Sequence, residues 1–140
     1  MRRRCFQVLL VLAFMGSLAA CSMAPKVSDD LTPAVYDFAQ RLRWNDYSGA
    51  SRYFDTEENR QEFLQTFTGM QDLQITDVVV ESIDFAEDRR SASTSMVLEY
   101  FLLPSPVVKT YRFSLQWAYL GLKPNSSESW LVSSRFPSFP

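Results

Sequence analysis

Residues 110–119 alternate between large apolar and polar side chains, and this pattern constrains the fold more than any other in the chain. Tyr111, Phe113, Leu115, Trp117 and Tyr119 occupy the odd positions, and mostly polar side chains occupy the even ones. Successive side chains of a strand point to opposite faces, so this period of two predicts a strand with one buried and one solvated face. The aromatic face has to be covered by another layer of structure, because leaving it exposed would invite aggregation.

Three further segments have the composition or the alternation of strands. Residues 74–85 are rich in β-branched side chains, residues 91–103 place apolar side chains mainly at even positions, and residues 130–136 alternate again. Turn residues at 87–90 and the Pro-Ser-Pro sequence at 104–106 separate these segments. Four successive strands joined in this way predict an antiparallel meander.

Before residue 73 the apolar side chains repeat with the period of a helix. The first helix is predicted to open with Thr32 as its N-cap and Pro33 in its first turn, and to end near Asn45. Asp46 is predicted to cap a short second helix over residues 46–54.

A third helix is predicted to begin at Asp55, in a DTEE sequence that resembles a capping box with Glu58 reaching back, and to end at Gly69. We expect no strand between the second and third helices. Helices followed by four strands predict an α+β domain, with N-terminal helices packed on a curved antiparallel four-stranded meander.

Two stretches resemble the NTF2-like superfamily, whose fold is a cystatin-like α+β roll. LRWNDYSGASRYFD (42–55) is similar to its helical entry, and YRFSLQWAYL (111–120) with SSESWLVSS (126–134) is similar to its closing hairpin. The resemblance implies a rolled sheet that can enclose a conical pocket, in which some members hold an Asp base and a Tyr donor. The superfamily usually has a strand between the second and third helices.

The N-terminus has the form of a secretory signal. Three arginines follow Met1, and residues 6–18 are nearly all apolar but too short for a span of about 20 residues. Leu18-Ala19-Ala20-Cys21 resembles the lipobox of bacterial lipoproteins. The resemblance implies cleavage before Cys21, a diacylglycerol on its sulfur and acylation of its amino group. The domains expected are residues 1–20 (signal peptide), 21–30 (tether) and 31–140 (NTF2-like domain).

The lipoprotein resemblance also predicts a location. Ser22 favours passage to the outer membrane, where the protein would face the periplasm, held in the lipid bilayer by acylated Cys21. Two or more acyl chains anchor a protein stably. The other cysteine, Cys5, lies in the part predicted to be removed, so no disulfide can form within the remainder.

Charge and composition exclude several function classes. Residues 1–20 contain three arginines and no acid, so the rest of the chain has 11 basic and 16 acidic side chains, a net charge of −5. A nucleic-acid partner would require a basic patch, which this negative net charge does not favour. We therefore expect no nucleic-acid partner. The chain has no histidine, and this removes Ser-His-Asp and Cys-His catalysis and His-based zinc sites. We expect no cofactor, no metal and no catalytic residue.

The remaining candidates for chemistry are carboxylates and aromatic side chains. Asp77 and Glu81 share the odd face of the first strand with Ile75, Val79 and Ile83. If that face is inward, Glu81 is a buried acid with a raised pKa. If the even side chains of that strand are inward instead, both acids are solvated. The latter is the simpler interpretation.

Five aromatic side chains are interpreted first as core: Tyr100, Tyr111, Trp117, Tyr119 and Trp130. Trp117 and Trp130 are predicted to be buried on strands that pair. The alternative is a ligand pocket, and the side chains that would line it are Glu81, Tyr100, Trp117, Tyr119 and Trp130.

Three function classes remain. The favoured one is a non-enzymatic, membrane-anchored binding or accessory module of the cell envelope, whose partner is an envelope protein or a small apolar ligand. The alternatives are a small isomerase- or dehydratase-like enzyme that uses a pocket carboxylate, and a structural lipoprotein of an envelope assembly.

Overall fold

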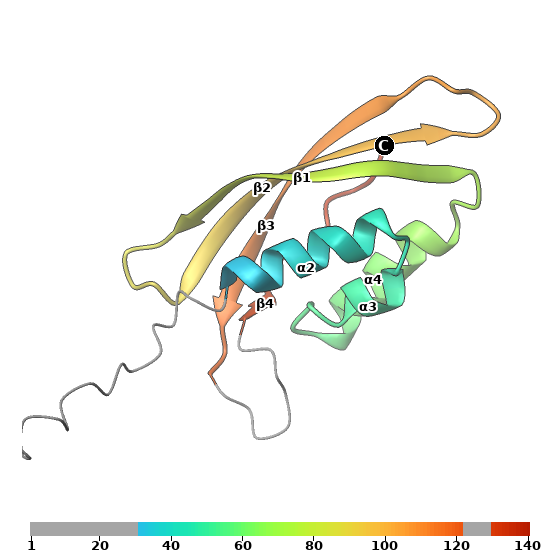
Figure 1. Ribbon diagram of the computed structural model, residues 1–140. Coiled ribbons are helices and arrows are strands. Elements are labelled where there is room, and N and C mark those ends of the chain that lie inside the picture. Colours follow the sequence, from blue (N-terminus) through green and yellow to red (C-terminus); the bar gives the residue numbers. More distant parts are fainter. Residues whose placement is uncertain (1–30, 122–129) are drawn as a thin grey trace, which may run out of the picture.

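A computed structural model describes residues 31–121 and 130–140 of the chain. Three helices come first and four strands follow, and Figure 1 shows the helices on one side of the sheet. The elements are α2 (Leu31–Arg43), α3 (Tyr47–Ser51), α4 (Glu57–Thr68), β1 (Leu73–Phe85), β2 (Ser91–Leu102), β3 (Lys109–Tyr119) and β4 (Trp130–Val132). Within these residues no helix has the length and apolar character needed to cross a bilayer.

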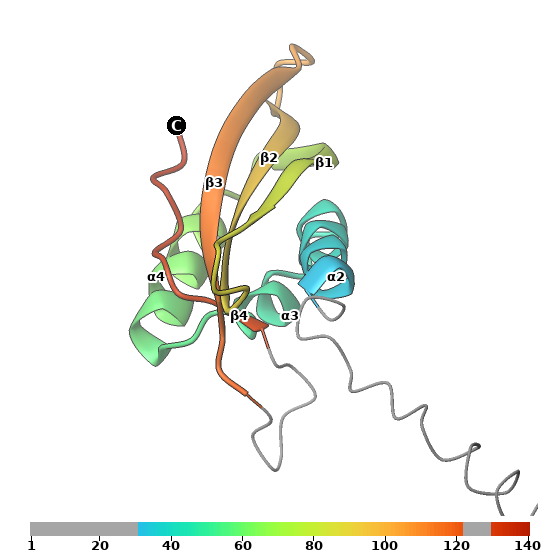
Figure 2. The same ribbon diagram turned by 90° about the vertical axis from the view of Figure 1, so that its left-hand side faces the viewer.

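The sheet has the order β1-β2-β3-β4, and every neighbouring pair is antiparallel. This arrangement confirms the predicted α+β class and the four-stranded meander. Figure 2 shows that β3 bends along its length and that the β2–β3 hairpin extends well beyond the helices. The predicted last strand is shorter than expected: it ends at Val132, and the following segment runs along the helix side of the sheet.

The ends of α2 differ slightly from the prediction. The helix already includes Leu31, so Thr32 lies within the first turn and is not the N-cap. At the other end Asn45 has a φ of 57°. Its N–H donates to Leu42 O at 3.1 Å, and the N–H of Asp46 donates to Arg41 O at 2.8 Å. These two bonds form a Schellman motif, which satisfies the last carbonyl groups of the helix.

Asp46 caps α3 as predicted, with Oδ1 accepting from the N–H of Gly49 at 2.9 Å. That hydrogen bond is the main cause of the lowered pKa of Asp46. A Cβ at position 49 would collide with the Asp46 carboxylate and the Arg41 guanidinium, so any larger residue there would displace the cap.

The cap of α4 is Thr56, and the prediction that Asp55 begins this helix was wrong. Thr56 Oγ1 accepts from the N–H of Asn59 at 3.2 Å. Asp55 precedes the cap: its N–H donates to Val132 O at 3.0 Å, and its Oδ1 accepts from Asn59 Nδ2 at 3.2 Å. Glu58 does not reach back, and it contacts Arg135 at 3.1 Å instead. Gly69 is the C-cap, as expected.

A single parallel bridge joins Phe54, between α3 and α4, to Val132 of β4. The N–H of Val132 donates to Tyr53 O at 2.7 Å, so the chain pairs with β4 on both sides of the bridge. The sequence predicted no strand between the second and third helices. A pairing this short has no alternating pattern to detect, and this explains why it was missed.

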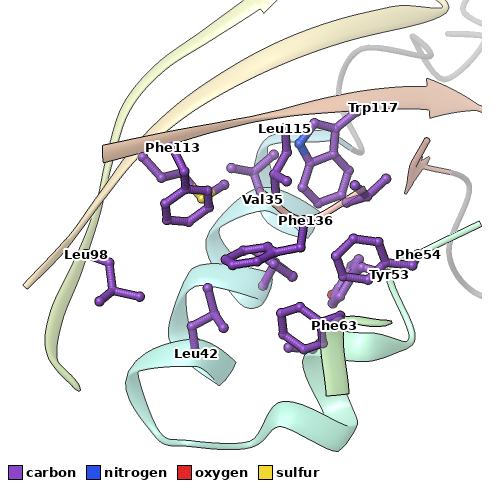
Figure 3. Close-up of a cluster of buried hydrophobic side chains, with 14 of the residues drawn as sticks. Val35, Leu42, Tyr53, Phe54, Phe63, Leu98, Phe113, Leu115, Trp117 and Phe136 are labelled. Atoms are coloured by element: carbon purple, nitrogen blue, oxygen red, sulfur yellow. The ribbon is translucent and has the colours of Figure 1, made fainter. Parts of the chain in front are cut away.

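The core lies between the helices and the inner face of the sheet, and Figure 3 shows its side chains pointing toward one another. Phe38 of α2 is at its centre, with ring centroids 5.9–6.2 Å from those of Tyr53, Phe54, Phe63 and Trp117. Three of these four contacts are edge-to-face, an arrangement that aromatic pairs prefer.

The prediction for the two tryptophans of the sheet is confirmed. Trp117 and Trp130 are 0% and 1% exposed, and their strands β3 and β4 pair. The indole N–H of Trp117 donates to the hydroxyl of buried Thr94 at 3.0 Å.

Candidate functional site

Two β-bulges decide which face of β1 carries its acids. The register against β2 shifts between Ile75 and Asp77 and again between Val80 and Ser82. Each bulge adds one residue to β1 and so reverses the alternation of its side chains. The prediction that one face holds all the odd residues from 75 to 83 was therefore wrong. The pairs on the inner face include Ile75 with Tyr100, Val78 with Leu98, Val80 with Met96 and Ile83 with Thr94.

Glu81 lies on the opposite, outer face and is exposed. Arg112 of β3 holds its carboxylate with two hydrogen bonds, Nε to Oε2 at 2.9 Å and Nη2 to Oε1 at 2.8 Å. The bonds from Arg112 lower the pKa of Glu81, so the group is an ionised, paired carboxylate at neutral pH. The interpretation of a buried acid with a raised pKa is wrong, and the solvated alternative is confirmed.

Asp77 also lies on the outer face, where it pairs in register with Glu99. Its Oδ1 is 3.6 Å from Arg43 Nη1 and accepts from the N–H of Val78 at 2.9 Å. The carboxylate therefore links the end of α2 to β1.

The aromatic side chains considered for a pocket are on the inner face, away from Glu81. Tyr100, Trp117 and Trp130 are buried, and Tyr119 is partly buried with its ring 5.6 Å from that of Trp130. Phe139 covers Tyr100, and the centroids of the two rings are 4.9 Å apart. The structure thus brings four of the five predicted lining residues to the inner face and leaves Glu81 on the other side of the sheet.

The outer face is a broad polar surface with one ion pair near its middle. Gln116 Nε2 donates to Ser93 Oγ at 3.1 Å, and Ser95 Oγ contacts Glu81 Oε2 at 3.4 Å. We use "outer face" for the following side chains of β1, β2 and β3: Asp77, Val79, Glu81, Ser93, Ser95, Val97, Glu99, Arg112, Ser114 and Gln116. Its hydroxyl, amide and charged groups can form hydrogen bonds with a polar partner surface.

A second surface is the tip of the β2–β3 hairpin, residues 103–108. Leu103, Val107 and Val108 are each half or more exposed. The N–H of Leu103 donates to Asp72 O at 3.0 Å and that of Ser105 to Leu102 O at 2.9 Å, so this turn is held in place. Sequence reasoning interpreted Pro-Ser-Pro only as a strand break. Residues 100–108 contain no charged side chain, and this pattern could have indicated an exposed apolar tip.

A polar cluster also joins α2 to α3. Asp37 Oδ2 accepts from Tyr53 Oη and from Arg41 Nε, both at 2.6 Å, and Arg41 Nη1 donates to Asp46 at 2.8 Å. Partial burial raises the pKa of Asp37, but the hydrogen bonds from Tyr53 and Arg41 outweigh it, and the pKa is lowered. The cluster fastens two helices, and we assign it a structural role.

No group of three or more metal-ligating side chains occurs in the part of the chain that the structure describes. Cys21 and the predicted signal and tether lie outside the described residues. No protein-family model and no curated protein matches the sequence.

Proposed function

We propose that the protein is an outer-membrane lipoprotein anchored through Cys21, whose NTF2-like domain acts in the periplasm as a non-enzymatic binding or accessory module. The observation that carries this choice over an enzyme is the placement of the two strand acids. Glu81 and Asp77 are on the outer face, and aromatic side chains occupy the inner face. An enzyme with a pocket carboxylate would need one acid among those aromatic groups.

The bridge at Phe54 supports the NTF2-like part of the proposal. It lies between α3 and α4, the position at which that superfamily has a strand between its second and third helices. The meander order and the helices on one face are also compatible with that fold. A structural lipoprotein of an envelope assembly remains the second candidate, because the outer face and the hairpin tip are both available for protein contacts.

The anchor is tested by mass spectrometry of the detergent-extracted protein. We expect a chain that begins at Cys21 and carries acyl groups on that residue. Cys21→Ser should leave the precursor uncleaved or release a soluble form, because the acceptor of the lipid is lost. A mature chain that begins elsewhere, or an intact Met1, would refute the anchor.

The non-enzymatic role is tested with three outer-face variants, Glu81→Gln, Arg112→Gln and Gln116→Ala, scored for the phenotype that loss of the gene causes. A contact surface that includes these residues predicts that all three weaken function to similar extents while expression and melting are retained. Asp77→Asn removes the other strand acid of the outer face, which lies beside Arg43 at the end of α2, and tests the second candidate base. If Glu81→Gln or Asp77→Asn alone abolished function, catalysis by a carboxylate would replace this proposal.

A further inference from the structure

The outward side of α2 has a stripe of aromatic side chains that the core does not use. Tyr36, Gln40 and Trp44 are spaced four residues apart, so they lie one above another along the helix. Trp44 is 74% exposed and Tyr36 is 52% exposed. The opposite side of the helix supplies the buried core residues, including Phe38 and Leu42. Fold stability therefore gives no reason for large aromatic rings on the outward side.

The stripe is ordered, and the charged side chains next to it within α2 are paired. The indole N–H of Trp44 donates to Gln40 Oε1 at 2.9 Å, and the N–H of Trp44 donates to Gln40 O at 3.0 Å. Asp37, next to Tyr36, is engaged by Arg41 and Tyr53. Arg43, next to Trp44, lies 3.6 Å from Asp77.

The length of chain that precedes α2 indicates what can reach this stripe. Residues 22–30 separate Cys21 from Leu31, and nine residues span at most about 30 Å when extended. Tyr36 follows Leu31 by little more than one helical turn. If Cys21 is in the bilayer, the outward side of α2 stays within a short distance of the headgroups, at a high effective concentration.

The hairpin tip, in contrast, lies far from the N-terminal end of α2. Figures 1 and 2 both show the β2–β3 hairpin at the far end of the molecule from the beginning of α2. The aromatic stripe thus begins nearer to the predicted anchor than the hairpin tip lies.

We propose that the stripe of Tyr36, Gln40 and Trp44 (the α2 stripe) rests on the membrane in which Cys21 is anchored. This inference rests on the lipoprotein anchor proposed above. Tyr and Trp favour the membrane–water interface because each has an apolar ring and a polar group that stays hydrated. The contact depends on the rings and not on net charge, so it does not require anionic lipid.

The test uses the full-length lipidated protein in phosphatidylcholine vesicles, with Trp44 as the reporter. Trp117 and Trp130 are buried, so acrylamide and brominated lipid report mainly on Trp44. We expect the emission of Trp44 to move to shorter wavelength, its quenching by acrylamide to fall to half or less of the value for soluble Cys21→Ser protein, and chain-brominated phosphatidylcholine to quench it. Trp44→Phe should remove all three effects.

Two variants separate the α2 stripe from the hairpin tip. Tyr36→Ser should weaken the shielding of Trp44, whereas Val107→Ser, which removes a similarly exposed apolar side chain at the tip, should leave it unchanged. Added phosphatidylglycerol or salt should have little effect. Loss of shielding in Val107→Ser with none in Tyr36→Ser would show that the tip makes the contact and would overturn the inference.

Flotation of the protein with the vesicles distinguishes this inference from the anchor itself. Protein that floats but leaves Trp44 fully open to acrylamide would overturn the α2 contact alone. Protein that does not float and has an unmodified Cys21 would overturn both. Shielding of Trp44 in whole envelopes but not in vesicles would identify a protein as the occupant, and would also overturn the inference.

Discussion

Thr94 is a hydroxyl-bearing residue on the inner face of β2, and Trp117 explains why it is there. Thr94 is fully buried, and its Oγ1 accepts from the indole N–H of Trp117 at 3.0 Å. A buried indole N–H without an acceptor would lose its hydrogen bond to water and gain nothing in return. The threonine thus allows a tryptophan to be fully buried on the inner face of β3.

We predict that Thr94→Val lowers the free energy of unfolding by about 1–3 kcal/mol, although the two side chains have nearly the same shape. The cause is the unsatisfied N–H of Trp117, and urea unfolding measures it. Thr94→Ser keeps the acceptor and should cost less. Ser93→Ala, at the neighbouring position on the outer face, should change stability by no more than about 0.5 kcal/mol. Equal losses in Thr94→Val and Ser93→Ala would show that the buried bond contributes little.

At the scale of the element, the helix ends were predicted only in part: the N-cap expected at Thr32 and the helix start expected at Asp55 were wrong. The end of α2 near Asn45 and the caps at Asp46 and Gly69 were predicted, because their signals lie within a few residues of sequence. The bulges of β1 were not predicted, since they depend on the pairing with β2. Sequence reasoning therefore left both orientations of Glu81 open, and only the register of the strands decides between them.

The positive φ of Asn45 leads to a prediction about the end of α2. Asn45→Val should lower the free energy of unfolding by about 1–2 kcal/mol, because a left-handed backbone is strained for a β-branched residue. Asn45→Gly is the control, and it should be nearly neutral even though it removes the hydrogen bond from Tyr47 Oη to Asn45 Oδ1. Thermal melts of the two variants give the comparison. Similar losses of stability in both variants would mean that the hydrogen bond from Tyr47 to Asn45, and not backbone strain, determines the effect.

At the scale of the whole molecule, the last residues of the chain complete the core. Phe136 is buried, with its ring 5.1–5.4 Å from the rings of Phe63, Phe67 and Phe113. Tyr111 Oη donates to Ser138 O at 3.0 Å and holds the same segment to β3. The sequence predicted Phe136 as part of a strand. Its burial comes instead from a segment without secondary structure that packs between α4 and the sheet.

Phe136→Ala should therefore cost about 3–5 kcal/mol, as for a buried aromatic side chain within a regular element. A domain has only about 5–15 kcal/mol of stability in total, so the melting temperature should fall steeply. Ser138→Ala, an exposed change in the same segment, keeps the carbonyl that Tyr111 uses and should have little effect. A melting temperature for Phe136→Ala close to that of the parent would show that the segment only lies against the core.

The position of Phe136 and Phe139 in the chain has a consequence for the order in which the domain can form. Synthesis proceeds from the N-terminus, so α2 and α4 are made before the sheet and the closing segment that bury their apolar sides. The contacts that complete the core join residues far apart in sequence, and such contacts slow folding. The aromatic side chains of α4 therefore cannot be fully covered until residues 136–139 have been added. Until then Phe63 and Phe67 leave apolar surface open to contact with other unfolded chains.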